Sequence, residues 1–157
     1  MYKITKMKIE EEIKQTKFRD IYEKAVLNLF VTTNGIEALV NRLMKGYGIT
    51  MQQFNVLRIL KGQYPNPAPL NLISCRMLDK MSNASRIIDK LVAKELITRN
   101  TCPNDRRAVD HLITQKGMEL LVKVNESLYE LYDKKFKNLN KTETEQLNKL
   151  LQGETKR

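Results

Sequence analysis

The sequence is poor in the residues from which covalent cross-links and metal sites are built. It contains two cysteines, one histidine and no tryptophan among its 157 residues. Cys75 and Cys102 lie far apart, and a reducing compartment disfavours a structural disulfide, so both are expected to be free thiols. One histidine and two scattered cysteines lack the ligand spacing of a zinc site. We therefore expect no bound metal and no cofactor.

Long apolar runs and catalytic motifs are also missing. No segment approaches the roughly 18 to 20 consecutive apolar residues of a membrane span, and the N-terminus alternates lysine with glutamate where a signal peptide needs an apolar core. The sequence has no glycine-rich phosphate loop, no nucleophile motif and no acid and base paired at a common cleft. These absences predict a cytoplasmic protein that has no membrane partner and is not an enzyme.

What the sequence does contain is positive charge and enough aliphatic residues for a core. Lysine and arginine number 28 against 18 aspartates and glutamates, which gives a formal net charge of +10 at pH 7. Such an excess indicates polyanionic partners rather than a particular fold. Because 41% of the residues are hydrophobic, the chain can bury a core as one globular domain or as two small lobes.

Helical periodicity dominates both ends of the chain. From about residue 8 to 45, apolar residues repeat at three- and four-residue steps until Gly46 ends the pattern. A second long apolar stripe begins after Thr114. Both stripes exceed what one small lobe can cover, so we expect them to pair with a second copy of the chain about a two-fold axis. Residues 1–46 and 116–157 are accordingly predicted to form dimerisation helices.

The central segment, residues 47–115, predicts a lobe of short helices and two strands. The first helix ends near Gly62, and the prolines between residues 63 and 69 predict a loop before a short helix that ends near Leu78. Serine, threonine and asparagine at suitable places indicate where helices begin. The predicted N-caps of the chain are Thr50 with Gln53, Asn71, Ser82, Thr114, and Thr142 with Glu145.

Two short helices joined by a brief turn make a helix-turn-helix. The second helix has an apolar face formed by Ala84, Ile87, Ile88 and Leu91, and its opposite face is polar and basic. Because the N-terminal end of such a helix enters the major groove first, four residues are candidates for base contacts: Ser82, Asn83, Ser85 and Arg86. Four lysines and arginines are candidates for phosphate contacts: Lys90, Lys94, Arg76 and Lys80. Basic faces are also common on ordinary solvated helices, so this helix alone does not decide the function.

A β-hairpin wing is predicted directly after this helix. Its predicted strands are Leu96–Arg99 and Val109–Ile113, and its predicted turn is Pro103–Asp105. Asp105 can orient the guanidinium of Arg107 through a bidentate pair, and arginine suits the narrow, negative minor groove of DNA. The same pair could serve only as a surface salt bridge of the hairpin. Arg106 and Arg107, however, place two guanidinium groups beside the basic helix, which indicates binding to double-stranded DNA.

Several motifs, in this order, resemble those of the MarR family of bacterial winged-helix transcription regulators. They are Ile73-Ser74, Ser85-Arg86-Ile87-Ile88-Asp89-Lys90-Leu91, Leu96-Ile97-Thr98-Arg99, Asp105-Arg106-Arg107 and Ile113-Thr114-Gln115-Lys116-Gly117. The resemblance implies a mainly α fold with a small β-hairpin wing, in which a winged helix-turn-helix lobe is joined to a helical dimerisation region.

The same resemblance implies a function. A homodimer would bind a pseudo-palindromic operator, most often as a repressor. A small aromatic or phenolic effector would bind in a crevice between the dimerisation helices and the lobe and would release the repressor from the operator. The helix that follows Ser82 would be the recognition helix. Arg107 would be the minor-groove residue, and Asp105 its orienting partner.

Two residues depart from the family pattern. Glu95 stands where the family usually has glycine after the recognition helix, which predicts a different turn or a less strained helix end. His111 occupies a strand position that is usually apolar. We expect it to be a satisfied core histidine rather than a sensor of pH or of a ligand.

Other functions remain to be weighed against DNA binding. A winged helix can act through protein contacts or bind RNA, but the predicted recognition helix and wing lack the aromatic side chains on which RNA bases stack. Cys102 lies among Arg99, Arg106 and Arg107, whose positive field favours its thiolate and would suit a redox-sensing regulator. Peroxide-responding members of the family carry their sensing cysteine near the N-terminus, where this chain has none.

Overall fold

The structure is a computed structural model that describes residues 8–79, 81–102 and 105–154, with the backbone alone for residues 101, 102, 105–108 and 154. In chain order the elements are α1 (Ile9–Glu12), α2 (Ile21–Gly46), α3 (Met51–Gln63), β1 (Ala68–Pro69), α4 (Leu70–Arg76), α5 (Ala84–Ala93), β2 (Ile97–Cys102), β3 (Asp105–Ile113), α6 (Gln115–Phe136) and α7 (Lys141–Glu154). The predicted fold class, mainly helical with a β wing, is confirmed.

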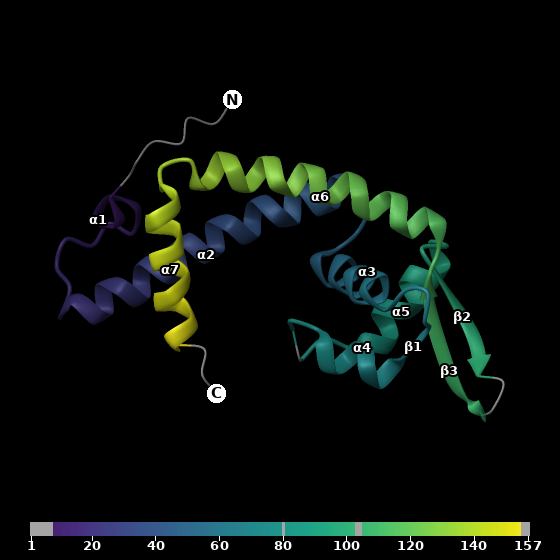
Figure 1. Ribbon diagram of the computed structural model, residues 1–157. Helices are drawn as coiled ribbons and strands as arrows, with labels where there is room; N and C mark the ends of the chain where they lie inside the picture. Colours follow the sequence, from purple (N-terminus) through teal and green to yellow (C-terminus); the bar gives the residue numbers. More distant parts are fainter. Residues whose placement is uncertain (1–7, 80, 103–104, 155–157) are drawn as a thin grey trace.

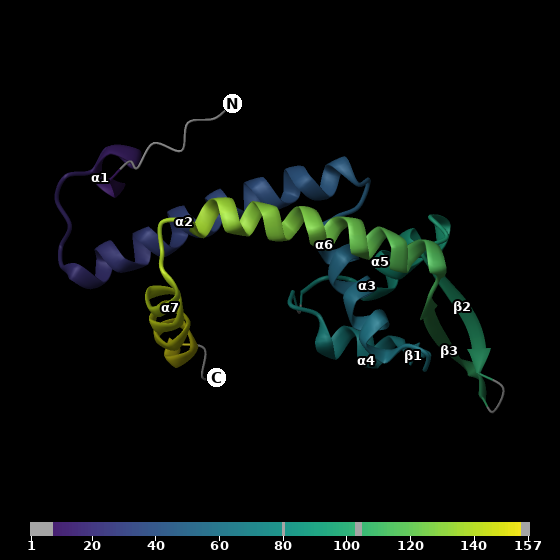
Figure 2. The same cartoon turned by 45° about the horizontal axis from the view of Figure 1, so that its top comes forward.

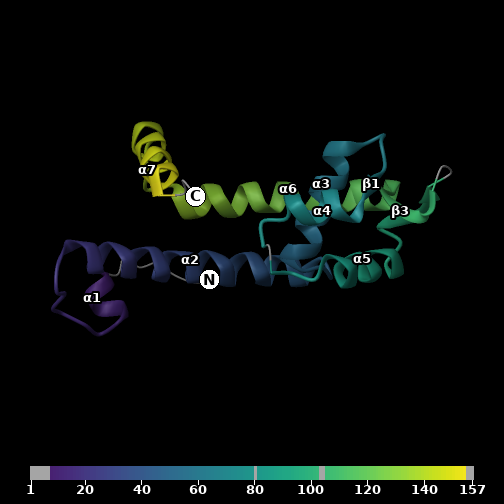
Figure 3. The same ribbon diagram turned by 90° about the horizontal axis from the view of Figure 1, so that it is seen from below.

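Two long helices organise the molecule. Helices α2 and α6 lie side by side, and the short helices and the sheet gather at one end of this pair (Figure 1 and Figure 3). Helices α1 and α7 lie at the other end, where α7 turns away from the axis of α6 (Figure 2). None of the helices in the described ranges is both long enough and apolar enough to cross a membrane.

The N-terminal helix begins later than its apolar pattern predicts. The chain leaves the helical conformation after α1, Lys14 has a positive φ of 54°, and α2 starts only after Asp20. The Asp20 carboxylate accepts hydrogen bonds from the backbone N–H groups of Tyr22 (3.0 Å) and Glu23 (2.8 Å). A single helix over residues 8–45 is therefore a wrong prediction, because an aspartate N-cap starts a new helix inside a stretch of continuous periodicity.

The first helix of the lobe is capped as predicted. The Thr50 side chain accepts from the Gln53 N–H, and the Gln53 side chain accepts from the Thr50 N–H, both at 3.2 Å. This capping box sets the rotation of α3 so that Phe54, Leu57 and Leu60 are fully buried. They share one core with Val40 and Met44 of α2, Ile73 of α4, Ile88 and Leu91 of α5, and Leu121, Val124 and Leu128 of α6. The lobe and the long helices are thus packed together.

Three other predicted N-caps are wrong by one or two positions. Helix α4 starts after Pro69 rather than Asn71 and ends at Arg76, before Leu78. Pro69 is the N-cap and offers no side-chain hydrogen bond to the helix. The corresponding caps are Asn83 rather than Ser82 for α5, and Asn140 with Glu143 rather than Thr142 with Glu145 for α7. The prediction for α6 is confirmed, since the Thr114 hydroxyl accepts from the Gly117 N–H at 3.1 Å.

The sheet has a third strand that the sequence did not predict. Ala68 and Pro69 form β1, which pairs antiparallel with His111 and Asp110 of β3, so the strand order is β1-β3-β2. The run of prolines indicated a loop, yet a proline is tolerated on an edge strand. Strands β2 and β3 are also longer than predicted, and their pairing continues to Cys102 and Asp105.

Candidate nucleic-acid interface

Helix α5 presents one face to the core and the other to solvent. Ala84, Ile88 and Leu91 are buried, as predicted, while Ile87 is only half-buried. Asn83 caps the helix by accepting a hydrogen bond from the Arg86 N–H at 3.0 Å. This cap holds the N-terminal turn of α5 in place, which is the turn that a recognition helix brings to the bases.

The predicted base-contacting residues do not all point outward. Ser85 and Arg86 are exposed, whereas the Ser82 hydroxyl donates to the Asp79 carboxylate at 2.5 Å. Because Asn83 Oδ1 accepts from the backbone of its own helix, mainly its NH2 group is left to donate to a base. Among these candidates, Arg86 is therefore the side chain best placed to read a base edge.

The predicted phosphate-binding residues also separate into groups. Lys90 on α5 and Arg76 at the end of α4 are exposed. The Lys94 ammonium instead donates to the Gly48 carbonyl and, at 3.1 Å, to Gln53 Oε1. Lys94 thus ties the C-terminal end of α5 to the junction between α2 and α3, a role its basic character did not reveal. Lys80 lies outside the described residues.

Two residues of α3 join this face, although the sequence did not point to them. Thr50 and Gln52, both exposed, line a shallow depression of about 350 Å³ together with Arg86 and Lys90. The capping box at Thr50 was visible in the sequence, but only the packing of α3 against α5 shows that the two helix N-termini share one surface. Hydroxyl and amide groups at such a place suit phosphate oxygens.

An ion pair joins the wing to α5. The Arg99 guanidinium on β2 contacts the Asp89 carboxylate on α5. Asp105 begins β3 rather than lying in the turn, and Arg106 and Arg107 follow it on the same strand. The side chains of these three residues lie outside the described part of the chain, as do Pro103 and Asn104, so the predicted Asp105–Arg107 pair stays a prediction.

His111 is a core residue, as expected. Its ring is buried, with 3% exposed, and Nδ1 lies 3.3 Å from the Ala68 carbonyl oxygen. Burial lowers the pKa of His111 below its ordinary value, which favours the neutral ring. Cys75 is exposed on α4, whereas the Cys102 side chain is not described. Within the described residues, no group of histidine, cysteine, aspartate and glutamate could hold a metal ion.

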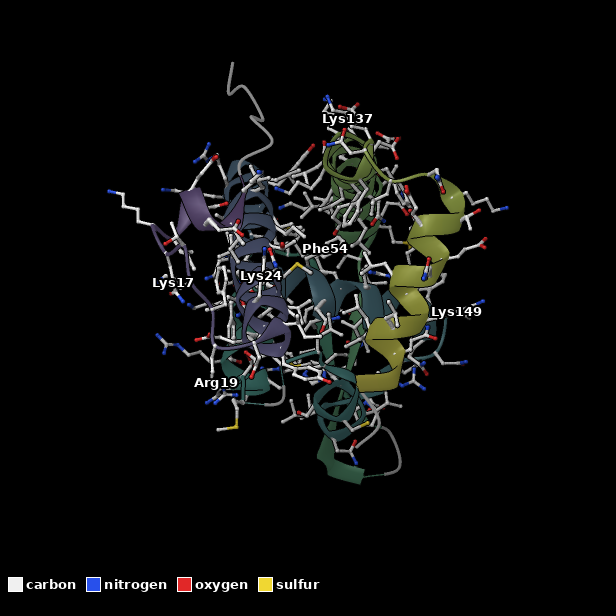
Figure 4. All side chains as sticks on the ribbon, turned by 90° about the vertical axis from the view of Figure 1, so that its left-hand side faces the viewer. Lys17, Arg19, Lys24, Phe54, Lys137 and Lys149 are labelled. Atoms are coloured by element: carbon white, nitrogen blue, oxygen red, sulfur yellow. The ribbon has the colours of Figure 1, made fainter. Side chains whose placement is uncertain are left out.

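Positive charge is not confined to this face. Figure 4 views the molecule from the end opposite the wing and shows Lys17 and Arg19 on the segment before α2, with Lys137 and Lys149 near α7. Lys24 is engaged there, because its ammonium contacts Glu10 at 2.6 Å and lies 5.4 Å from the centre of the Phe18 ring. The net charge therefore does not locate the interface, whereas the exposed basic face of α5 beside the wing (Figure 1) does mark one surface.

A crevice lies beside the turn that leads into α5. It has a volume of about 510 Å³ and lies between α2, α3, α6 and the turn that follows α4. Its lining residues are Ile36, Glu37, Val40, Asn41, Met51, Gln52, Asn55, Met77, Leu78, Asp79 and Tyr132. The size is that of a small-molecule site, and the turn on its wall leads directly into α5.

Comparisons of sequence agree with this arrangement. The model of a protein family described as the MarR family matches residues 49–109. The chain is 30% identical over 110 residues to the transcriptional repressor MprA of Escherichia coli strain K12, an alignment that covers 70% of this chain and 62% of MprA. It is 31% identical over 99 residues to the HTH-type transcriptional regulator MhqR of Bacillus subtilis strain 168, covering 60% of this chain and 67% of MhqR. The match thus spans less than two thirds of the length of MprA.

Solved structures share the fold. The organohalide-sensing regulator RdhR-CbdbA1625, in its 2,4-dichlorophenol-bound form, aligns with a TM-score of 0.76 at 15% identity, covering 88% of this chain and 84% of that one. The S. aureus MepR–DNA complex aligns with a TM-score of 0.68 at 18% identity, covering 82% of this chain and 91% of that one. At these identities the likeness establishes the fold alone.

Proposed function

Because the chain belongs to the MarR family of transcription regulators, we propose that it binds a pseudo-palindromic operator in double-stranded DNA as a homodimer. It acts as a repressor, and a small-molecule effector releases it from the operator. Its place of action is the cytoplasm. The family consists of regulators rather than enzymes, so binding and release of DNA, and not a chemical reaction, are what the residues have to perform.

The observation that carries this proposal is the outer face of α5. Arg86 and Ser85 stand exposed on its first turn, and Lys90 stands exposed further along the helix. Arg86 donates to a guanine edge in the major groove, and Lys90 contacts a phosphate. Arg107 enters the adjacent minor groove with Asp105 as its orienting partner. MepR, which has the same fold, was solved in complex with DNA, and this supports the proposed partner.

The exposed apolar residues of α2 support a homodimer. Tyr22, Val26, Leu29 and Phe30 recur at helical steps, and each is at least 48% exposed. Leu150 of α7 is also exposed, at 65%. Such a surface favours self-association about a two-fold axis. Two recognition helices related in this way read half-sites whose centres are about 10 base pairs apart.

The crevice is the proposed effector site. Its wall includes Ile36 of α2, Tyr132 of α6 and Leu78 of the turn before α5, so a bound molecule contacts both the dimerisation helices and the turn that leads into the recognition helix. Its apolar and aromatic side chains accept the body of a small aromatic or phenolic compound; they are Ile36, Val40, Met51, Met77, Leu78 and Tyr132. The structure of RdhR-CbdbA1625 with 2,4-dichlorophenol supports an effector of that kind.

The decisive experiment is selection of bound duplexes from a random DNA library, followed by footprinting and sedimentation. The proposal predicts an enriched sequence with two-fold symmetry, protected by a species of twice the 18.3 kDa chain mass. The variant Lys149→Ala, changed on α7 at the opposite end, is the control and should select the same sequence. Failure to enrich any sequence, or protection by a monomer, would contradict the proposal and favour a lobe that acts through protein contacts.

A further inference from the structure

We infer that the crevice lined by α2, α3, α6 and the turn before α5 selects an organic cation with an aromatic or bulky apolar body. The inference rests on the proposed function, because a ligand at this place regulates the chain only if the chain binds an operator. It goes further by fixing the charge of the effector. The phenolic class expected from the family is then accepted in its neutral form, while phenolate and carboxylate ions are disfavoured.

The described lining of the crevice is acidic. Glu37 and Asp79 contribute two carboxylates, and the described residues of the wall include no lysine, arginine or histidine. Four further cavities along the described residues each include basic side chains, such as Lys116 of α6 or Arg99 of β2. In a chain of net charge +10, the described lining of this crevice therefore carries negative charge alone. Two nearby carboxylates favour a cation and repel an anion.

The rest of the lining offers apolar, aromatic and amide side chains. Two methionines, Met51 and Met77, offer flexible and polarizable side chains that adapt to irregular ligands. The half-buried Tyr132 adds an aromatic face, which attracts a cation through the electrostatic field of its ring. Apolar walls, an aromatic ring and carboxylates in one crevice of about 510 Å³ together match the body and the charge of an organic cation.

The surroundings of Asp79 link this site to the recognition helix. Its carboxylate accepts from the Met81 N–H at 3.0 Å and from the Ser82 hydroxyl at 2.5 Å, and thereby shapes the turn that leads into α5. The hydrogen bond from Ser82 is the main cause that lowers the pKa of Asp79, so the group stays ionised. The Ser82 N–H and the Gln52 side chain also act on this carboxylate, so it attracts a ligand through its charge rather than through a free acceptor position.

The two carboxylates come from different parts of the molecule. Glu37 belongs to α2, a dimerisation helix, whereas Asp79 belongs to the turn before α5. The neighbouring Leu78 N–H donates to Asn55 Oδ1 at 3.0 Å, which holds this turn against α3. A cation held between Glu37 and Asp79 would bridge the two parts and bias where the recognition helix sits relative to its partner in the dimer. A ligand acts on the operator only through such a difference between states.

The test uses three probes that share one ring system and differ in charge: (1-naphthylmethyl)trimethylammonium, 1-naphthalenemethanol and 1-naphthoate. Binding to the full chain is followed by naphthalene fluorescence, which is free of tryptophan signal because the chain has none. The inference predicts that the cation binds at least tenfold more tightly than naphthoate, with the alcohol between them. Glu37→Gln should weaken the cation about three- to tenfold and leave the alcohol unchanged, because one screened charge at contact distance is lost.

A matched control separates the crevice from the overall charge. Glu119→Gln removes the same charge from the lining of a different cavity, on α6, and should leave all three affinities unchanged. Tighter binding of naphthoate than of the cation, or an equal effect of Glu37→Gln and Glu119→Gln, would overturn the inference. Operator binding without any probe is titrated in parallel. If the operator is bound but the charge preference is absent, only this inference fails, whereas absence of operator binding by the wild type refutes the proposed function itself.

Discussion

Gly117 has less room for a side chain than any other glycine of the chain. It lies in the first turn of α6, and a Cβ there would stand 2.3 Å from the Leu96 carbonyl oxygen and 2.8 Å from Ile113 Cγ1. The same carbonyl accepts from the Thr114 N–H at 3.1 Å, and the Thr114 hydroxyl donates to the Glu95 carbonyl at 2.8 Å. The start of α6 is therefore pressed against the turn between the recognition helix and the wing.

Gly117→Ala should force these backbones apart, because no side-chain rotation relieves a clash with a carbonyl oxygen. We expect a loss of about 2 to 4 kcal/mol in the free energy of unfolding, from overpacking and a weakened hydrogen bond. For a chain of this length that corresponds to a decrease in Tm of roughly 5 to 15 °C. Operator affinity should also decrease at temperatures and urea concentrations at which the variant is still folded, because α6 connects the wing to the dimerisation helices.

Urea unfolding and thermal melts of the variant, the wild type and Gly62→Ala test this reasoning. Gly62 lies inside α3 with nothing within 4 Å of its would-be Cβ, so alanine there should be neutral or should stabilise by up to about 1 kcal/mol. If Gly117→Ala unfolds within about 0.5 kcal/mol of the wild type, a margin typical of harmless surface changes, the close approach at Leu96 is refuted.

Three further predictions concern the interface and its supporting turn. Lys90→Ala should reduce the slope of log affinity against log salt by about 1, whereas Lys94→Met should leave the slope unchanged. Titrations at several salt concentrations measure both slopes, and equal decreases would mean that Lys94 also contacts a phosphate. Glu95 has a positive φ of 61°, a conformation that is strained for any residue but glycine. Glu95→Gly should therefore raise the Tm by a few degrees, although the exposed ion pair with Lys116 is lost. A lower Tm in a thermal melt would contradict this backbone strain. Arg107→Ala should weaken operator binding about tenfold or more, and Asp105→Ala by less, in gel-shift titrations of folded variants; equal losses would argue against an orienting role for Asp105.

The sequence predicted most helices of the lobe because their signals are local. The capping box at Thr50 and the cap at Thr114 depend on side chains within one turn, and the buried face of α5 follows from its spacing. Where several polar residues adjoin, the rule does not choose among them. Ser82 and Asn83 are both good caps, and the choice is made by Asp79, which takes the Ser82 hydroxyl into the preceding turn.

Contacts between distant segments lay beyond sequence patterns. The strand at Ala68 exists because β3 offers it a partner at His111, and no local residue signals that pairing. Glu95 adopts the left-handed conformation in place of the usual glycine because its neighbours are fixed: the Leu96 N–H bonds to the Leu91 carbonyl at 3.0 Å. In the same way, the basic character of Lys94 suggested a phosphate, while its length let it reach Gly48 across the lobe.

The most direct test of the account is a titration of wild type and Arg86→Ala on a selected operator and on a set of duplexes changed at single base pairs. Arg86 is exposed on the first turn of α5, and its backbone N–H is held by the Asn83 cap, so truncation removes a base contact without disturbing the helix. The account predicts a loss of about 1 to 3 kcal/mol and relaxed preference at one base pair in each half-site. If Arg86→Ala binds the operator as tightly and as selectively as wild type, α5 is not the recognition helix.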